Sequence, residues 1–202
     1  MMLLLLSALA MADGPPKYAA SDELRARVKA RMDDAFGVEC MTHTEEMASF
    51  GLGQIRVYPA FSKDSPQLVQ VPCALGAYNL AYIHFLLRPS GDLEELQFAV
   101  PSYRFHTEAK GSVKYTVVDE IQGFGTVRAL VNAVYDPETV TIQSYSKGRG
   151  VGDAFSSGRW RWNSNHNFVL EHFEADRSLD GKVTPTVIFS RDNADTSAGD
   201  KK

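Results

Sequence analysis

The sequence predicts a mainly β protein, either an antiparallel β-sandwich or two packed β-meanders, with one N-terminal helix. Helical periodicity occurs convincingly only in "SDELRARVKARMDDAFG" near the N-terminus. After residue 50 the apolar residues alternate, and Gly, Pro, Asn and Asp turns separate short apolar runs. With 202 residues, 44% of them hydrophobic and 23% charged, the chain has room for one domain with a substantial core.

The helix is expected over residues 21–36. Its apolar stripe recurs every four residues: Leu24, Val28, Met32 and Phe36. Ser21 can cap the first turn, Asp22 and Glu23 suit the positive end of the helix dipole, and Gly37 can end the helix. Since the other face is charged, we expect the helix to pack one side onto a sheet.

The remaining chain is expected to form a single domain over residues 13–190, with two candidate meander halves at 50–100 and 112–190. The segment "AYNLAYIHFLLR" is apolar on both faces, which predicts a central strand that is covered on both sides. In "TVRALVNAVY", alternation would place Val127, Ala129, Val131, Ala133 and Tyr135 on one face of a strand.

The two ends of the chain read as segments outside this domain. Residues 1–12, "MMLLLLSALAMA", end in small residues, as a secretory signal does, and are too short to cross a bilayer. We therefore expect a periplasmic or secreted protein that begins near Asp13 and is not stably inserted in a membrane after cleavage. The alternative is a buried N-terminal segment. The polar tail, 191–202, is expected to be disordered.

Two cysteines, Cys40 and Cys73, are candidates for one disulfide. In an oxidising compartment this bond would close a loop of about thirty residues and stabilise the fold by about 3–4 kcal/mol. Two buried free thiols are the alternative. The sequence has no CxxC spacing, so it indicates neither thioredoxin-like chemistry nor a structural zinc site.

A Gly-rich stretch, "SYSKGRGVGDAFSSGRWRW", carries the strongest local charge. Residues 144–162 contain four cations, Lys147, Arg149, Arg159 and Arg161, and one carboxylate, Asp153. The whole chain, in contrast, has a net charge of −4. Its spacing fits neither a Walker loop nor a dinucleotide fingerprint, and an acidic chain argues against nucleic-acid binding. The stretch is either an anion or partner site built on backbone N–H groups, or a β-corner in which Asp153 holds the turn closed.

Trp160 and Trp162 are two residues apart, so a strand would place them on one face, with Arg159 and Arg161 on the other. The tryptophans are either core residues or an exposed platform for a sugar or a partner. The candidate binding residues are therefore Lys147, Arg149, Asp153, Arg159, Trp160 and Trp162.

Histidines near carboxylates are the only candidate catalytic residues that the sequence offers. His43 and His106 each begin an "HTE" tripeptide, which in a strand would place the histidine and Glu45 or Glu108 on one face. His166 and His172 lie near Glu171 and Glu174. No HExxH or G-x-S-x-G motif occurs, so no catalytic residue, metal ligand or cofactor is assigned.

Three segments together resemble the bacterial family called domain of unknown function 1176: "VPCALGAYN", "LVNAVYDPETVTIQSYSKGRGVGD" and "RWRWNSNHNFVL". The resemblance covers about residues 65–175. It implies an exported, periplasmic protein of Gram-negative bacteria without an assigned activity. Ala154 and Phe155 follow Asp153 where family members often carry a cysteine, so a later disulfide is not expected here.

Three functional hypotheses remain open. The first is a non-catalytic module that binds an envelope protein or a small anionic ligand through the corner at 147–153 and the tryptophan strand. The second is an envelope hydrolase that uses His/Glu pairs. The third is a structural corner, with the function elsewhere on the protein.

Overall fold

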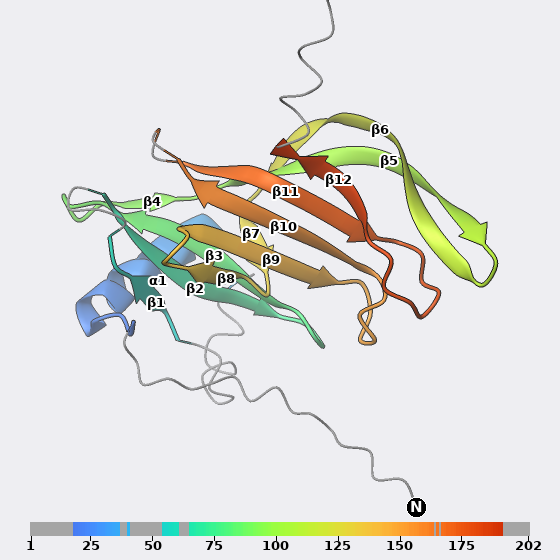
Figure 1. Cartoon of the computed structure of the whole chain (residues 1–202). Helices are drawn as coiled ribbons and strands as arrows, with labels where there is room; N and C mark the ends of the chain where they lie inside the picture. The colour runs from blue at the N-terminus through green and yellow to red at the C-terminus, as the bar shows by residue number, and fades with distance from the viewer. Residues whose placement is uncertain are drawn as a thin grey trace, which may run out of the picture.

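Two antiparallel sheets and one long hairpin make up the fold (Figure 1). The computed structural model describes residues 18–36, 40, 54–60, 65–163, 165 and 167–191. Each sheet has five strands, and the two sheets pack face to face around a shared apolar core. The predicted mainly β class, with antiparallel sheets packed as a sandwich, is confirmed.

The first sheet is built from the N-terminal half of the chain. Its strand order is β1 (Arg56–Tyr58), β2 (Gln67–Leu75), β3 (Leu80–Leu87) and β4 (Leu93–Glu95), and β7 (Ala129–Val131) also pairs with β3. Consecutive strands pair with each other, so β1–β4 form a meander.

The second sheet is a continuous meander. Its strands are β8 (Val134–Asp136), β9 (Thr141–Lys147), β10 (Phe155–Trp162), β11 (Phe168–Asp176) and β12 (Thr186–Ser190). Each of these strands pairs antiparallel with the next.

Strand β3 lies at the centre of the fold, with both faces covered. Leu86 belongs to the core between the two sheets, together with Ile142 and Trp160 of the second sheet. Ile83 and Phe85 belong to a second core on the opposite face. The prediction of a central strand covered on both sides is therefore confirmed, and its period-two alternation explains the two cores.

The single described helix, α1 (Asp22–Phe36), covers the outer face of the first sheet (Figure 1). Its bounds agree with the predicted 21–36, and the N–H of Leu24 donates to the Ser21 hydroxyl at 3.3 Å, as expected for a cap. Leu24, Val28 and Met32 are buried against the sheet. Gly37, the expected end signal, lies outside the described residues.

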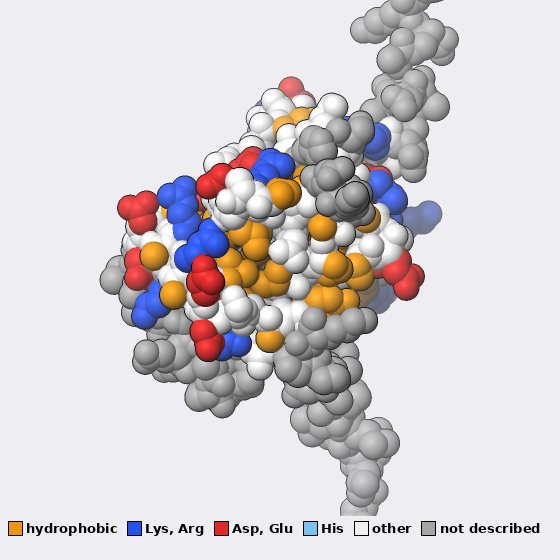
Figure 2. All heavy atoms as spheres, turned by 90° about the vertical axis from the view of Figure 1, so that its left-hand side faces the viewer, with side chains coloured by type: hydrophobic (Ala, Val, Ile, Leu, Met, Phe, Trp, Pro, Cys, Tyr) orange, Lys and Arg blue, Asp and Glu red, His pale blue; other side chains and the backbone are white. Residues whose placement is uncertain are grey.

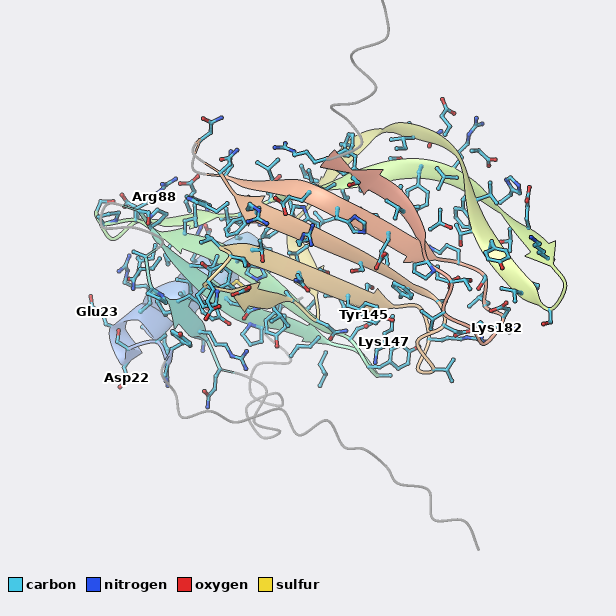
Figure 3. All side chains as sticks on the ribbon, in the orientation of Figure 1. Asp22, Glu23, Arg88, Tyr145, Lys147 and Lys182 are labelled. Carbon is cyan, nitrogen blue, oxygen red and sulfur yellow. A yellow bond between two sulfur atoms is a disulfide. The ribbon has the colours of Figure 1, made fainter. Side chains whose placement is uncertain are left out.

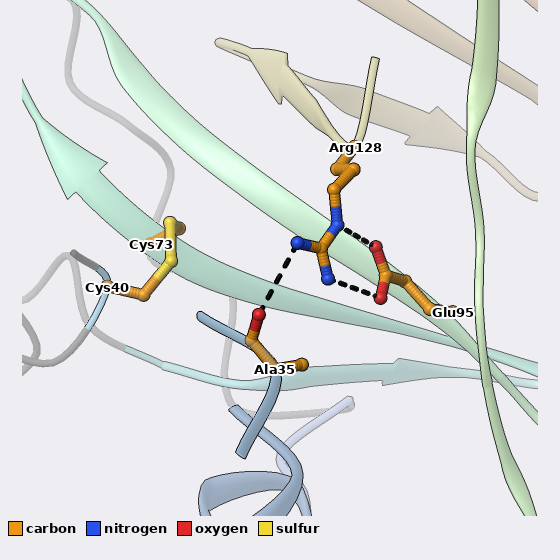
Figure 4. The surroundings of a disulfide bond; sticks show 5 residues. All are labelled: Ala35, Cys40, Cys73, Glu95 and Arg128. Carbon is orange, nitrogen blue, oxygen red and sulfur yellow. Dashed lines mark hydrogen bonds and ion pairs between the residues drawn. A yellow bond between two sulfur atoms is a disulfide. The ribbon is translucent and has the colours of Figure 1, made fainter. Parts of the chain in front are cut away.

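Arg128 fastens the C-terminal end of α1 to the first sheet (Figure 4). Its guanidinium binds the Glu95 carboxylate with both Nε and Nη2, and its Nη1 donates to the carbonyl of Ala35 at 3.4 Å. The same group lies 3.8 Å from the centre of the Phe36 ring. The cation therefore contacts both the Ala35 carbonyl and the Phe36 ring in the last turn of the helix.

A disulfide joins Cys40 to Cys73 of β2 beside α1 (Figure 4). Both cysteines are buried in the core under the helix. The bond therefore ties the chain that follows α1 to the strand that the helix covers.

The chain between the two predicted meander halves differs from the expectation. Residues 98–127 form a long hairpin of β5 (Phe98–Lys110) and β6 (Val113–Val127), which packs against β11 and β12. A boundary at 100–112 therefore falls inside this hairpin.

The expected strand with one shared face over 127–135 is wrong. Asn132 has a φ of 47° and divides the segment into β7, which pairs with the first sheet, and β8, which pairs with the second. The chain crosses between the sheets at this residue, so alternation along the segment does not continue.

Several predictions fall on residues outside the described ranges. These are the signal at 1–12, the tail beyond Arg191, His43 and His166. Within the described residues, no helix has the length and apolar character needed to cross a membrane.

Candidate functional site

The Gly-rich corner joins β9 to β10 and is closed by backbone hydrogen bonds. The N–H of Gly148 donates to the carbonyl of Ala154 at 2.7 Å, and the N–H of Gly152 donates to that of Arg149 at 3.0 Å. Gly152 has a φ of 74°, a conformation that glycine adopts without strain. A Cβ on Gly148 would lie 3.2 Å from the Ala154 oxygen, closer than an unstrained contact. The glycines therefore make a tight turn.

Asp153 forms the interior of this corner. Its side chain is almost fully buried, and its carboxylate accepts two hydrogen bonds from Arg149, one of them 2.5 Å from Nε to Oδ1. It also accepts the N–H of Gly181 at 2.8 Å. The guanidinium and this N–H hold the pKa of Asp153 at about 2, well below the usual range.

Arg149 is therefore not a free cation. Besides Asp153, its Nη2 donates to the carbonyl of Leu179 at 3.1 Å. The sequence left open whether the corner exposes Arg149 or uses Asp153 to hold the turn closed. The geometry of these two residues matches the second alternative.

Two asparagines bind the start of the corner to the first sheet. Asn79 donates to the carbonyl of Lys147 at 2.9 Å and accepts the N–H of the same residue at 3.1 Å. Asn132 donates to the carbonyl of Tyr145 at 2.9 Å and accepts the N–H of Leu80 at 2.9 Å. The segments that carry the family resemblance, 71–79 and 130–153, therefore meet at this junction between the sheets.

Neither asparagine was selected from the sequence. The available signal was their position in those two segments, next to turn residues. Side-chain amides can both donate and accept, so they can join backbone groups of two sheets that do not pair directly.

Trp160 needs correction as a candidate for an exposed platform. Only 1% of it is exposed, its ring contacts Phe98 with centroids 5.6 Å apart, and its indole N–H donates to the carbonyl of Ala99 at 2.8 Å. Trp162 is half-buried and its ring lies 5.2 Å from that of Phe168. A buried ring cannot stack on a ligand, so the tryptophans serve the core.

Arg159 and Arg161 lie on the outer face of the second sheet, opposite to the tryptophans. Both form ion pairs with Glu171 of the neighbouring strand, with 3.2 Å between Arg159 Nε and the carboxylate. The positive charge that the sequence placed in β10 is thus partly neutralised by β11. Arg159, a candidate binding residue, is engaged within the sheet.

The described histidines are spread over three strands. His106 of β5 is exposed between Asp119, 2.7 Å from Nδ1, and Glu108, 3.2 Å from Nε2, and these carboxylates raise its pKa. His172 of β11 lies 3.5 Å from Glu174. Among the described residues, no three His, Cys, Asp or Glu side chains are grouped as metal ligands.

His84 of β3 is a titratable residue that the sequence analysis did not select. It is fully buried between the sheets, with its ring 5.3 Å from that of Phe98, and neither ring nitrogen has a partner among the described residues. Burial lowers its pKa to about 3, so the ring is neutral at pH 7. Its place inside an apolar central strand was the only signal in the sequence.

Four chain segments meet at the end of the sandwich that contains the corner (Figure 1). We call this region the loop end and define it as residues 75–79, 110–114, 147–153 and 177–183. The corner contacts the first segment through Asn79 and the fourth through Asp153. The fourth contacts the hairpin tip, where the N–H of Lys114 donates to Asp180 at 2.7 Å and Lys182 donates to the Ser112 hydroxyl at 2.9 Å.

The loop end is cationic. It contains six basic side chains and two carboxylates, Asp153 and Asp180, a net charge of +4 on a chain of −4. The basic side chains are Lys110, Lys114, Lys147, Arg149, Arg177 and Lys182. Within the described part of the chain, Arg149 alone of these six forms an ion pair with a carboxylate. Lys147 at the end of β9 and Lys182 between β11 and β12 lie at the same end of the molecule (Figure 3).

A concave feature lies at the N-terminal end of α1. This open hollow of about 310 Å³ is lined by Ala20, Leu24, Arg27, Gln67 and Leu87, among others. The lining residues include no histidine, so the hollow does not unite the His/Glu pairs of the hydrolase hypothesis.

Comparison with known proteins identifies the family. The family model described as "Protein of unknown function (DUF1176)" matches residues 10–183. No curated protein and no solved structure matches the chain significantly. Because the matched region spans most of the sequence and includes the corner and every described strand except β12, the chain belongs to the DUF1176 family.

Proposed function

We propose that this protein is an exported, non-catalytic binding module that contacts its partner with the loop end. The proposal is supported by the difference between the paired and the unpaired cations of the loop end. Arg149 and Asp153 hold the loops together, whereas Lys110, Lys114 and Lys147 have no side-chain partner among the described residues. A rigid framework with surplus positive charge favours an anionic partner.

Export is supported by the cysteines and by the first twelve residues. Both described cysteines are joined in one disulfide, a bond that persists in oxidising compartments and is rare in the cytosol. Residues 1–12 have the apolar run and small-residue end of a secretory signal. Expression of the full chain in a Gram-negative host, followed by mass measurement of the recovered protein, should give a mature chain that begins near Asp13. An intact N-terminus on soluble cytosolic protein would contradict export.

The binding role is tested with envelope extract passed over the immobilised mature protein. The bound lipids, proteins and polysaccharides are identified for the wild type and for Lys147→Glu. The matched control is Lys29→Glu, the same change of charge on the exposed face of α1. We expect a component that the wild type and the control retain and that Lys147→Glu loses. If every retained component binds all three proteins equally, the loop end is not the binding surface.

A further inference from the structure

The loop end exposes apolar side chains as well as cations. Five large hydrophobic residues are exposed at its loop tips: Leu75, Tyr78, Val151, Leu179 and Val183. Val151 at the apex of the corner is 77% exposed, the largest value among the large hydrophobic residues of the described chain. These side chains come from three of the four segments, so they are separate apolar tips on neighbouring segments.

Contacts between the segments hold these tips at the same end of the molecule. A Cβ on Gly150 would lie 3.6 Å from the Tyr78 ring, so the corner is close to the first segment. The corner and the fourth segment share Asp153, and the fourth segment and the hairpin tip share Asp180. Charge-assisted hydrogen bonds of this kind restrict the movement of one loop relative to the next.

Other exposed apolar regions have different surroundings. Along the β5–β6 hairpin, exposed Phe105 and Ile121 lie near the carboxylates of Glu108, Asp119 and Glu120, the last of which pairs with Arg104. At the opposite end of the molecule, Figure 2 shows hydrophobic side chains beside charged side chains of both signs. The loop end alone, among these three described regions, combines exposed apolar tips with a clear excess of positive charge.

We propose that the loop end binds the surface of an anionic phospholipid membrane. The apolar tips would enter the headgroup region, while Lys110, Lys114, Lys147 and Lys182 would contact lipid phosphates. A lipid surface accommodates apolar tips at any spacing, whereas a protein partner needs a complementary surface for separated side chains. This inference rests on the proposed function and names its ligand.

The lysines would make the binding selective for anionic lipids, and the apolar tips would let the protein enter the headgroup region. Each basic residue near an anionic leaflet strengthens binding about fivefold, and salt weakens this contribution because it screens exposed charges. The binding is peripheral, because the tips belong to short loops and not to a spanning segment.

Vesicle sedimentation with the mature protein tests the proposal. The two vesicle types are phosphatidylethanolamine with phosphatidylglycerol, which is anionic, and phosphatidylcholine alone, which is neutral. We expect the wild type to sediment with the anionic vesicles and to be released by salt. Lys147→Glu and Val151→Ser should each weaken this binding about fivefold or more. The matched controls, Lys29→Glu and Val134→Ser, change exposed residues outside the loop end and should bind as the wild type does.

Insertion of the corner is tested separately with a fluorescent reporter. In Val151→Trp the added indole should show an emission shift to shorter wavelength with anionic vesicles, and in Val134→Trp it should show none. The two native tryptophans are buried or half-buried and serve as a constant background in both variants.

Three results would overturn the lipid inference: no sedimentation with anionic vesicles, equal sedimentation with neutral ones, or equal losses in the variants and their controls. If the protein does not bind the anionic vesicles but an acidic envelope protein binds through Lys147, the lipid inference is wrong and the proposed binding role stands. If nothing binds through the loop end, both proposals fail.

Discussion

The interior of the sandwich and the loop end are held together by different forces. In the interior, large apolar side chains such as Phe98, Ile142 and Trp160 pack between the sheets. At the loop end, the segments are joined mainly by hydrogen bonds and by the Arg149–Asp153 ion pair. Apolar packing contributes most of the stability of a domain, whereas a single hydrogen bond contributes only about 1 kcal/mol net. The comparison indicates that the interior carries most of the stability, which leaves the loop end available for the binding role proposed above.

The largest expected effect concerns Trp160. Trp160→Ala removes a fully buried ring and should lower the free energy of unfolding by about 3–5 kcal/mol, measured by urea denaturation. Trp162→Ala, at a half-buried position in the same strand, is the matched control and should cost clearly less. Equal losses for the two variants would contradict the assignment of Trp160 to the core.

The second prediction concerns pH and His84. An unfolded histidine titrates near pH 6.5, while the pKa of buried His84 is about 3, so between these values the unfolded chain binds the extra proton. This residue's contribution is complete above pH 6.5 and falls by about 1.4 kcal/mol per unit as the pH drops towards 3. Denaturation at a series of pH values should show this slope in the wild type.

His84→Leu should lose this slope, because it removes the buried titrating group. His106→Gln is the control, since neighbouring Glu108 and Asp119 raise the pKa of exposed His106, and a raised pKa does not give a loss of stability at acid pH. If His84→Leu and the wild type have the same pH dependence between 3 and 6.5, His84 is not buried in its neutral form.

The third prediction concerns the framework of the loop end. Asp153→Asn removes the charge that binds Arg149 and weakens the acceptor of the Gly181 N–H. We expect the amide of Gly181 to exchange its hydrogen about tenfold faster, while amides of the core strands change little. Hydrogen-exchange mass spectrometry measures both. Uniformly faster exchange across β3 and β10 would mean that the corner stabilises the whole fold.

The smallest effect is expected on the outer face of the second sheet. Glu171→Gln disrupts the pairs with Arg159 and Arg161, whose side chains are about half exposed. Exposed ion pairs contribute little, so the free energy of unfolding should change by about 1 kcal/mol or less. Binding at the loop end should be unchanged. A loss as large as that for Trp160→Ala would break the distinction between packed and polar regions.

Much of the fold follows from local patterns. The four-residue repeat from Leu24 to Phe36 and the cap at Ser21 predicted α1 within one residue. The two apolar faces around Ile83 predicted a central strand. Periodicity indicates these features because burial on one or both sides of an element leaves its mark in consecutive residues.

The errors arose where tertiary contacts override local pattern. Residues 127–135 alternate as a strand does, yet Asn132 turns the chain from one sheet to the other. The charge excess of 144–162 is a sum along the chain, although Glu171 of the neighbouring strand pairs with Arg159 and Arg161 in space. Contacts such as these depend on which strands pair with each other. Residue spacing along a single strand does not show that pairing.

The sequence by itself determined the class of fold, the position of the helix and the family, and it named Cys40 and Cys73 as candidates for a disulfide that the structure shows to be formed. Each depends on composition, period or motif, which a linear chain displays directly. Only the tertiary structure decided that Arg149 is engaged by Asp153, that Trp160 is buried and that four distant segments meet at one cationic end. These contacts and this burial depend on which strands and loops the two sheets bring together. Electrostatic attraction and packing depend on distance in space and not on distance along the chain.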